Sequence, residues 1–339
     1  MRQIVIVLIL SFSVNGIHSQ TGGDNIYEFL NLGPNAYISS LGGFNISTFG
    51  QDPTLAMINP ALSGEMSHGR LALNYVNYFA GINYGSALYS HYSDSLGSFT
   101  AGINYLNYGK FDRADEAGNI NGSFTASEYA FNIIYARQID SSFSFGVNLK
   151  PILSQLENHI SLGLALDAGA SYRSPDGLLS AGLVIRNMGF QLKKYTGNNE
   201  KLPFEIMAGI SSRLRHAPFR FSLTARHLEK YDLIHEYTGQ EENTGYTGIE
   251  EIAENIMRHL IFGAELIPSE NFFISAGFNY QRRKELLHEA RASTVGFSMG
   301  AGIKTSSLDI SLSRARYHLA GSSTNFSLLI KPSLFKSFR

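Results

Sequence analysis

Hydrophobic and polar residues alternate one by one along most of this chain from about residue 68 onward. Between Ser141 and Lys150, for example, Phe, Phe, Val and Leu alternate with Ser, Gly, Asn and Lys. The pentapeptide A-G-I-N-Y occurs at residues 80–84 and again at 101–105, and in both copies the pattern places Ile and Tyr on the apolar face. Because side chains of a strand point alternately to opposite faces, this period of two predicts β-strands with one apolar face and one small, polar face.

About fourteen segments of this kind can be placed, and most have the roughly 9–11 residues that a tilted membrane-spanning strand needs. Strands of soluble sheets are usually shorter, about 5–6 residues. The predicted strands are residues 70–79, 80–92, 97–108, 124–137, 141–150, 161–173, 177–186, 202–214, 219–227, 259–267, 272–282, 294–304, 307–317 and 324–331. We therefore expect an all-β fold: an outer-membrane antiparallel β-barrel of about 14 strands. A soluble β-sandwich with an apolar core is the alternative.

The connections between these segments are alternately short and long. Short turns are typical of the periplasmic end of an outer-membrane barrel, and long polar loops are typical of the outer end. The long connections are residues 109–122, 191–201, 229–258 and 283–292. The loop from 229 to 258 contains Ile249, Ile252 and Ile256 at helical spacing, which predicts a short amphipathic helix. That helix either packs on its own loop as a lid or docks a partner.

The stretch from Gly33 to Gly64 lacks the alternation and is predicted to be a hatch inside the barrel. One short helix fits Pro34–Gly43, with proline in its first turn and glycine at its end. A second fits Asp52–Ala61, with Asp52 as its cap and Pro53 at its first position. The lumen of a barrel tolerates such irregular backbone because polar partners are available there.

Composition supports export to a membrane. The first residues carry one arginine and then an apolar run of about ten residues, which matches a secretory signal peptide and is too short to span a bilayer. We expect cleavage after Ser19.

Charged residues make up only 16% of the chain, against a usual share of about 25%. The formal net charge of -1 argues against nucleic acid as a partner. The expected divisions are residues 1–19, signal peptide; 20–66, N-terminal segment and hatch; 67–333, barrel; and 334–339, C-terminal tail.

No motif for enzyme chemistry is present. The ten histidines include no H-E-x-x-H, and neither a G-x-S-x-G elbow nor a phosphate-binding G-x-x-x-x-G-K-[ST] loop occurs. The chain also contains no cysteine. We expect a protein that is not an enzyme and has no metal or cofactor.

If the apolar faces point outward, the opposite faces carry charges of both signs into the lumen. Buried charges need partners, so an ion-pair network that fills the lumen is favoured over a selective ion path. Two arginines, Arg314 and Arg316, fall on the outward face near the outer end of their strand, where they can reach lipid phosphates. The predicted lumen charges are Glu128, Lys150, Asp167, Arg186, Glu205, Arg220, Arg226, Glu265, Lys304 and Asp309.

The order of these features resembles a known family. A signal peptide, a helical N-terminal segment that ends in Asn59-Pro60-Ala61 and about fourteen strands resemble the FadL-like outer-membrane barrels, whose hatch carries an N-P-A motif. More narrowly, G-G-D-N-I-Y-E-F-L-N-L-G-P-N-A at residues 22–36, followed by L-G-G at 41–43, is similar to the PorQ-like barrels of the type IX secretion system. Unlike many barrels, this chain does not end on an aromatic residue.

The resemblance implies a location in the outer membrane of a Gram-negative, Bacteroidetes-type bacterium, in contact with its lipid and lipopolysaccharide. It implies an anchor subunit of a cell-surface attachment complex that holds a PorZ-like surface protein and, through it, a PorU/PorV-like sortase assembly. The alternative, which follows from the N-P-A hatch, is a FadL-type channel for hydrophobic small molecules.

Overall fold

The computed structural model describes residues 25–115, 117–195, 197, 199–234, 248–286, 294–318 and 321–331. The predicted signal peptide (residues 1–19) and C-terminal tail (334–339) lie outside these residues. Among the described residues, no helix is long and apolar enough to cross a bilayer.

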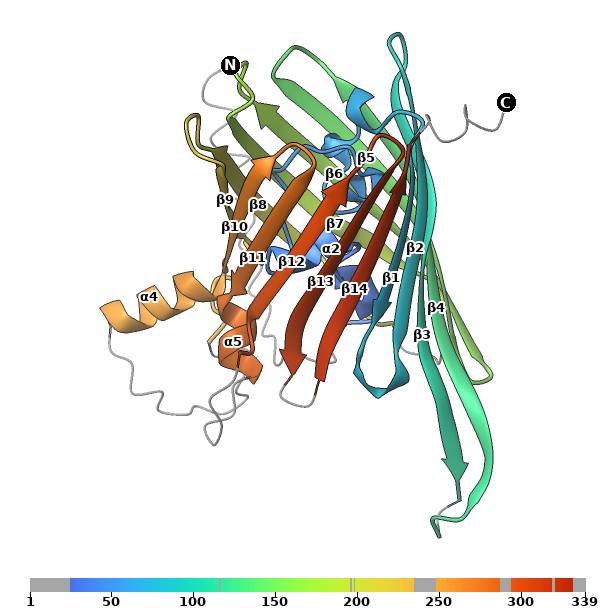
Figure 1. Ribbon diagram of the computed structural model, residues 1–339. Helices are drawn as coiled ribbons and strands as arrows, with labels where there is room; N and C mark the ends of the chain where they lie inside the picture. Colours follow the sequence, from blue (N-terminus) through green and yellow to red (C-terminus); the bar gives the residue numbers. More distant parts are fainter. Residues whose placement is uncertain are drawn as a thin grey trace, which may run out of the picture.

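Fourteen antiparallel strands form one closed barrel, in which each strand pairs with its neighbours in sequence and β1 closes against β14 (Figure 1). This confirms the fold predicted from the alternation of apolar and polar residues. The strands are β1 (Leu71–Asn77), β2 (Asn83–Ser93), β3 (Gly97–Ala114), β4 (Ile120–Gln138), β5 (Phe143–Leu156), β6 (His159–Arg173), β7 (Leu179–Lys193), β8 (Glu205–Arg213), β9 (Phe219–Ala225), β10 (Leu260–Ser269), β11 (Phe272–Asn279), β12 (Phe297–Lys304), β13 (Leu308–His318) and β14 (Gly321–Ile330).

The two ends of the barrel differ. At one end, here called the turn end, short turns join the strands in pairs: β2–β3, β4–β5, β6–β7, β8–β9, β10–β11 and β12–β13. At the other, the loop end, β3 and β4 continue as a long hairpin that extends beyond the other strands (Figure 1). Residues 109–122, predicted to be a loop, are therefore mostly strand. Phe111 pairs with Phe124 across this hairpin and their rings stack at 5.2 Å, which explains why the ladder continues.

Two helices follow at the loop end. The predicted amphipathic helix is present as α4 (Ile249–Arg258). A further helix, α5 (Tyr280–Leu286), takes residues that the alternation had assigned to a strand ending at residue 282. The reason is local: the side chain of Asn279 accepts a hydrogen bond from the Arg282 backbone N–H at 2.9 Å, as a helix cap does.

The first A-G-I-N-Y repeat also departs from the prediction. Ala80 and Gly81 both adopt left-handed backbone angles in the turn η5 (Phe79–Gly81), so β2 starts only at Asn83. As a result Tyr84 points into the barrel and is 1% exposed. In the second repeat, Tyr105 faces outward as predicted and stacks on Tyr129 at 4.6 Å.

The N-terminal segment lies inside the barrel, where Figure 1 shows α2 behind β12 and β13. Its elements are η1 (Glu28–Asn31), α2 (Ala36–Ser40), η2 (Pro53–Met57), η3 (Pro60–Leu62) and η4 (Glu65–Ser67). The cap of α2 is Asn35, which accepts from the Ile38 N–H. Asp52 caps η2 as predicted, but the second predicted helix is divided, because η2 ends at Met57 and Asn59 caps a separate 3-10 turn, η3.

Candidate functional site

The hatch is fastened to the barrel wall at the Asn-Pro-Ala tripeptide. The buried amide of Asn59 donates hydrogen bonds to the carbonyl oxygens of Ile46, at 2.9 Å, and Ala170, at 3.3 Å. The carbonyl oxygen of Ala61 accepts from the hydroxyls of Ser144 on β5, at 2.9 Å, and Ser171 on β6, at 3.1 Å. Proline at the first position of η3 sacrifices no hydrogen bond, because the N–H it lacks would have no partner within the turn. Irregular backbone is thus satisfied by the wall.

Inward-facing glycines allow this close approach. A Cβ atom at Gly169 would lie 2.1 Å from Oδ1 of Asn59, and one at Gly146 would lie 2.5 Å from the carbonyl carbon of Pro60. Gly182, on the next strand, meets the hatch in the same way, with 2.3 Å from its Cβ position to the nearest hatch oxygen. Any side chain at these places would collide with the hatch. The small, polar face predicted from the sequence is therefore the surface on which the hatch packs, here called the seat of the hatch.

The first buried charge group lies where β6 and β7 fall out of register. Asp167 faces two residues of β7, because the pairing shifts between residues 166 and 168, and this forms a β-bulge. Its carboxylate accepts the Asn187 backbone N–H at 2.7 Å and pairs with the ammonium of Lys150 at 2.6 Å. Asn187 itself has a left-handed φ of 58°, which asparagine tolerates better than most residues. The bulge therefore positions a buried ion pair.

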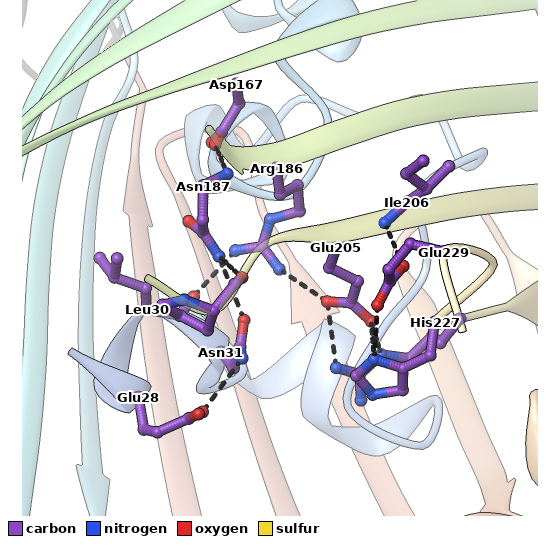
Figure 2. A network of polar contacts seen from close by, with 12 residues as sticks. Glu28, Leu30, Asn31, Asp167, Arg186, Asn187, Glu205, Ile206, His227 and Glu229 are labelled. Atoms are coloured by element: carbon purple, nitrogen blue, oxygen red, sulfur yellow. Dashed lines mark hydrogen bonds and ion pairs between the residues drawn. The ribbon is translucent and has the colours of Figure 1, made fainter. Parts of the chain in front are cut away.

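A second group links β7 and β8 to the hatch, and Figure 2 shows Arg186 between Glu205 and the carbonyl group of Leu30. The guanidinium of Arg226 binds both carboxylate oxygens of Glu205, at 2.6 and 3.1 Å, and lies 3.5 Å from the ring centroid of Phe44 in the hatch. Arg186 lies 3.9 Å from the same carboxylate and donates a hydrogen bond of 2.8 Å to the carbonyl oxygen of Leu30. Both cations thus share one carboxylate and also contact the hatch.

A third group lies nearer the turn end. Arg220 binds Glu265 through two hydrogen bonds of 2.7 and 3.1 Å, and the Tyr37 hydroxyl of the hatch donates to the same carboxylate at 3.0 Å. These three residues line one side of a cavity of about 460 Å³ that opens at the turn end. Phe49, Leu55 and other hatch and wall residues complete its lining.

The remaining predicted charges lie apart from these groups. Glu128 accepts hydrogen bonds from the hydroxyls of Tyr108 and Ser154. Asp309 pairs at 2.6 Å with Lys331, which is not among the predicted lumen charges, and Lys304 lies exposed at the rim of the cavity.

Arg314 and Arg316 belong to the outward face of β13, where Arg314 is exposed and Arg316 donates a hydrogen bond of 3.1 Å to the Thr294 hydroxyl. Their contact with lipid phosphates stays a prediction.

The wall between β7 and β8 contains a feature that the alternation did not indicate. Ladder pairing of these strands runs from Leu179–Ser212 to Arg186–Glu205, and β8 begins at Glu205, so residues 187–193 of β7 face the irregular residues 199–204. We call this region the seam. Side chains close it: Asn187 donates to the Pro203 carbonyl at 2.8 Å, and Oε1 of Gln191 accepts the Glu200 N–H at 2.8 Å.

Apolar residues lie on both sides of the seam. Leu202 is buried and belongs to the inner apolar cluster at the loop end, which also contains Tyr27, Leu30 and Tyr84. It packs over Gly189 of β7, where a Cβ atom would lie 2.9 Å from the leucine methyl. On the outer surface of the same strand, the side chains of residues 190 and 192, Phe and Leu, are exposed. Leu202 therefore joins the inner apolar cluster to a stretch of β7 whose outward side chains are apolar.

The described residues contain no cluster of histidines and carboxylates suited to a metal ion. In comparisons with known proteins, no protein-family model and no curated protein matches the chain. Solved structures do match. The Ralstonia pickettii toluene transporter TbuX is 13% identical with a TM-score of 0.53, and the match covers 90% of this chain and 98% of that one.

Two further structures are similar. The Pseudomonas putida toluene transporter TodX is 11% identical, with a TM-score of 0.52 over 88% of this chain and 98% of its own. The monoaromatic hydrocarbon channel CymD is 13% identical, with a TM-score of 0.50 over 88% of this chain and 97% of its own. At this level of identity the likeness establishes a shared fold.

Replacing Gly169 with alanine should loosen the hatch. The added methyl collides with Asn59, at a cost of about 1–3 kcal/mol, and the hatch must shift to relieve it. We expect faster release of a small polar dye from vesicles that contain the purified protein. Gly122→Ala, where a Cβ atom meets nothing within 4 Å, is the control. Equal release from both variants would contradict the assignment of Gly169 to the seat of the hatch.

Replacing Glu205 with glutamine should destabilise the barrel by about 3–5 kcal/mol, because two buried guanidinium groups lose their shared counter-charge. The measurement is the midpoint temperature of unfolding in detergent, monitored by the change in gel mobility on heating. Glu157→Gln serves as control, since Glu157 pairs with Arg113 on the surface, where an ion pair contributes about 0–1 kcal/mol. Similar midpoints for the two variants would show that the interior group contributes little.

Proposed function

We propose that this chain is a barrel in the outer membrane of a Gram-negative bacterium and passes small apolar molecules, in the manner of a FadL-type channel. The toluene transporters and the hydrocarbon channel share its fold over most of their length, which supports this class of function. The observation that carries the proposal is the seam, where the ladder of the wall stops and one buried leucine lies between apolar surfaces.

The interior argues against a straight route. The hatch is held by hydrogen bonds and by glycine contacts, and paired charges occupy the lumen around it. A polar solute would have to displace these groups. An apolar molecule that enters at the loop end meets the apolar cluster around Leu202 instead, and the nearest break in the backbone ladder is the seam. Since its closing contacts with β7 are made by side chains, opening it breaks no hydrogen bond of the β7–β8 ladder.

The seam proposal predicts that Leu202→Ala increases the rate of apolar uptake several-fold, because the removed side chain separates the interior cluster from the outer surface. The measurement is uptake of the apolar dye N-phenylnaphthylamine by cells whose outer membrane contains the protein. Leu88→Ala is the matched control, since Leu88 is also buried but lies in a different apolar cluster with Ile134.

Cells that contain the native protein should already take up more dye than cells without it. If native and protein-free cells take up the dye equally, or if Leu202→Ala and Leu88→Ala give the same rate, the channel proposal fails.

A second candidate is a surface anchor of the PorQ-like kind, which holds a PorZ-like protein and, through it, a PorU/PorV-like assembly. The observation in its favour is the β3–β4 hairpin, which extends from the loop end (Figure 1). Phe111 and Ile120 of this hairpin are exposed. The Arg113–Glu157 ion pair joins it to the connection between β5 and β6. A projecting hairpin with exposed apolar side chains suits contact with a protein partner.

The anchor candidate predicts that a shortened hairpin releases the partner. Replacing residues 112–123 by Asn-Gly joins the paired residues Phe111 and Phe124 through a two-residue turn, which should leave the barrel folded. Co-purification from the native membrane in mild detergent is then measured for a PorZ-like protein. Loss of that protein with unchanged dye uptake supports an anchor; a partner retained in full removes this surface from consideration.

A further inference from the structure

Helix α4 exposes its apolar side. Ile249, Ile252 and Ile256 are 85, 57 and 55% exposed and form one stripe along the helix, at spacings of three and four residues. A helix that covers a soluble surface turns such a stripe inward. No other described residue covers it, and residues 235–247 of its own loop, on which a lid would pack, lie outside the described residues.

The opposite side of α4 is polar and is directed toward the protein. Glu254 is only 7% exposed and accepts a hydrogen bond of 2.6 Å from the Tyr280 hydroxyl of α5. Lys284 of α5 and Arg258 each lie 3.2 Å from the same carboxylate. Burial alone would raise the pKa of Glu254. The hydrogen bond from Tyr280 and the charge of Lys284 nevertheless hold this pKa below its usual value. The charged face is therefore committed to α5, and the isoleucine stripe points away from it.

The position of α4 identifies what the stripe meets. Figure 1 shows α4 projecting sideways from the loop end of β9 to β11, with α5 beneath its base. The adjoining outer wall of the barrel is apolar up to these strand ends, where Phe262, Phe278 and Phe297 line a shallow hollow. In a membrane protein this wall faces acyl chains. A helix that leaves the wall sideways, with its apolar stripe turned from its polar neighbour, continues the same surface.

We propose that α4 is an interfacial helix whose isoleucine stripe lies in the acyl-chain boundary of the outer leaflet. The inference rests on the membrane location in the proposed function, but not on transport. Amphipathic helices with one apolar face bury that face about 5–10 Å into the boundary between headgroups and acyl chains. The ion pair and the hydrogen bond between α4 and α5 would then hold α5 on the aqueous side and fix the rotation of α4 about its own axis.

The chain contains no tryptophan, so one introduced indole reports on a single position. Ile252→Trp protein is purified and inserted into phosphatidylcholine vesicles, with or without bromine on the acyl chains. We expect blue-shifted emission and at least a twofold loss of intensity with the brominated lipid. Glu250→Trp, on an exposed polar position of the same helix, should emit as in water and lose little intensity. Phe297→Trp, on the outer wall, marks full contact with lipid.

Equal, weak quenching of Ile252→Trp and Glu250→Trp would overturn the proposal. Blue-shifted emission from Ile252→Trp without quenching would also overturn it, because the stripe would then be covered by protein, either this chain or a second copy. In both cases strong quenching of Phe297→Trp would show that the barrel itself is in the bilayer. Failure of the helix proposal is thereby separated from failure of the proposed function.

Discussion

The contact between the hatch and the inward-facing glycines of the wall is the constraint on which the rest of the structure depends. The hatch has little regular secondary structure, so its N–H and C=O groups need partners from elsewhere. Backbone can reach the serines of β5 and β6 only where no side chain intervenes, which Gly146 and Gly169 provide. Asn59 completes the contact by bonding at once to the hatch and to the wall.

The buried charges follow from the same arrangement. Lumen-facing positions next to an immobile hatch are removed from water, and a charge there is stable only beside its counter-charge. Lys150 and Asp167, and Arg220 and Glu265, are paired across adjacent strands, while Arg226 and Arg186 share Glu205. The paired charges and the hatch close the central path. The route for apolar molecules that we propose would then pass beside the hatch, through the seam, where the β7–β8 ladder stops.

Much of this architecture was predictable because alternation is a strong signal in a barrel wall that is apolar on one side and small or polar on the other. The number of strands, the capping of η2 by Asp52 and the helix α4 follow from local sequence. The departures depend on contacts between segments. The bulge at Asp167 is specified by an ion pair across strands, and Tyr84 turns inward because a left-handed residue shifts the phase of β2. No periodicity within one segment carries that information.

The central claim, that hatch and wall form one folded unit, is tested most directly by hydrogen–deuterium exchange on the native protein in detergent. Amides of residues 35–63 should exchange nearly as slowly as those of β5 and β6, because they open only when the wall contacts break. Rapid exchange of these residues beside protected strands would contradict the account, since the hatch would then move independently in an open lumen.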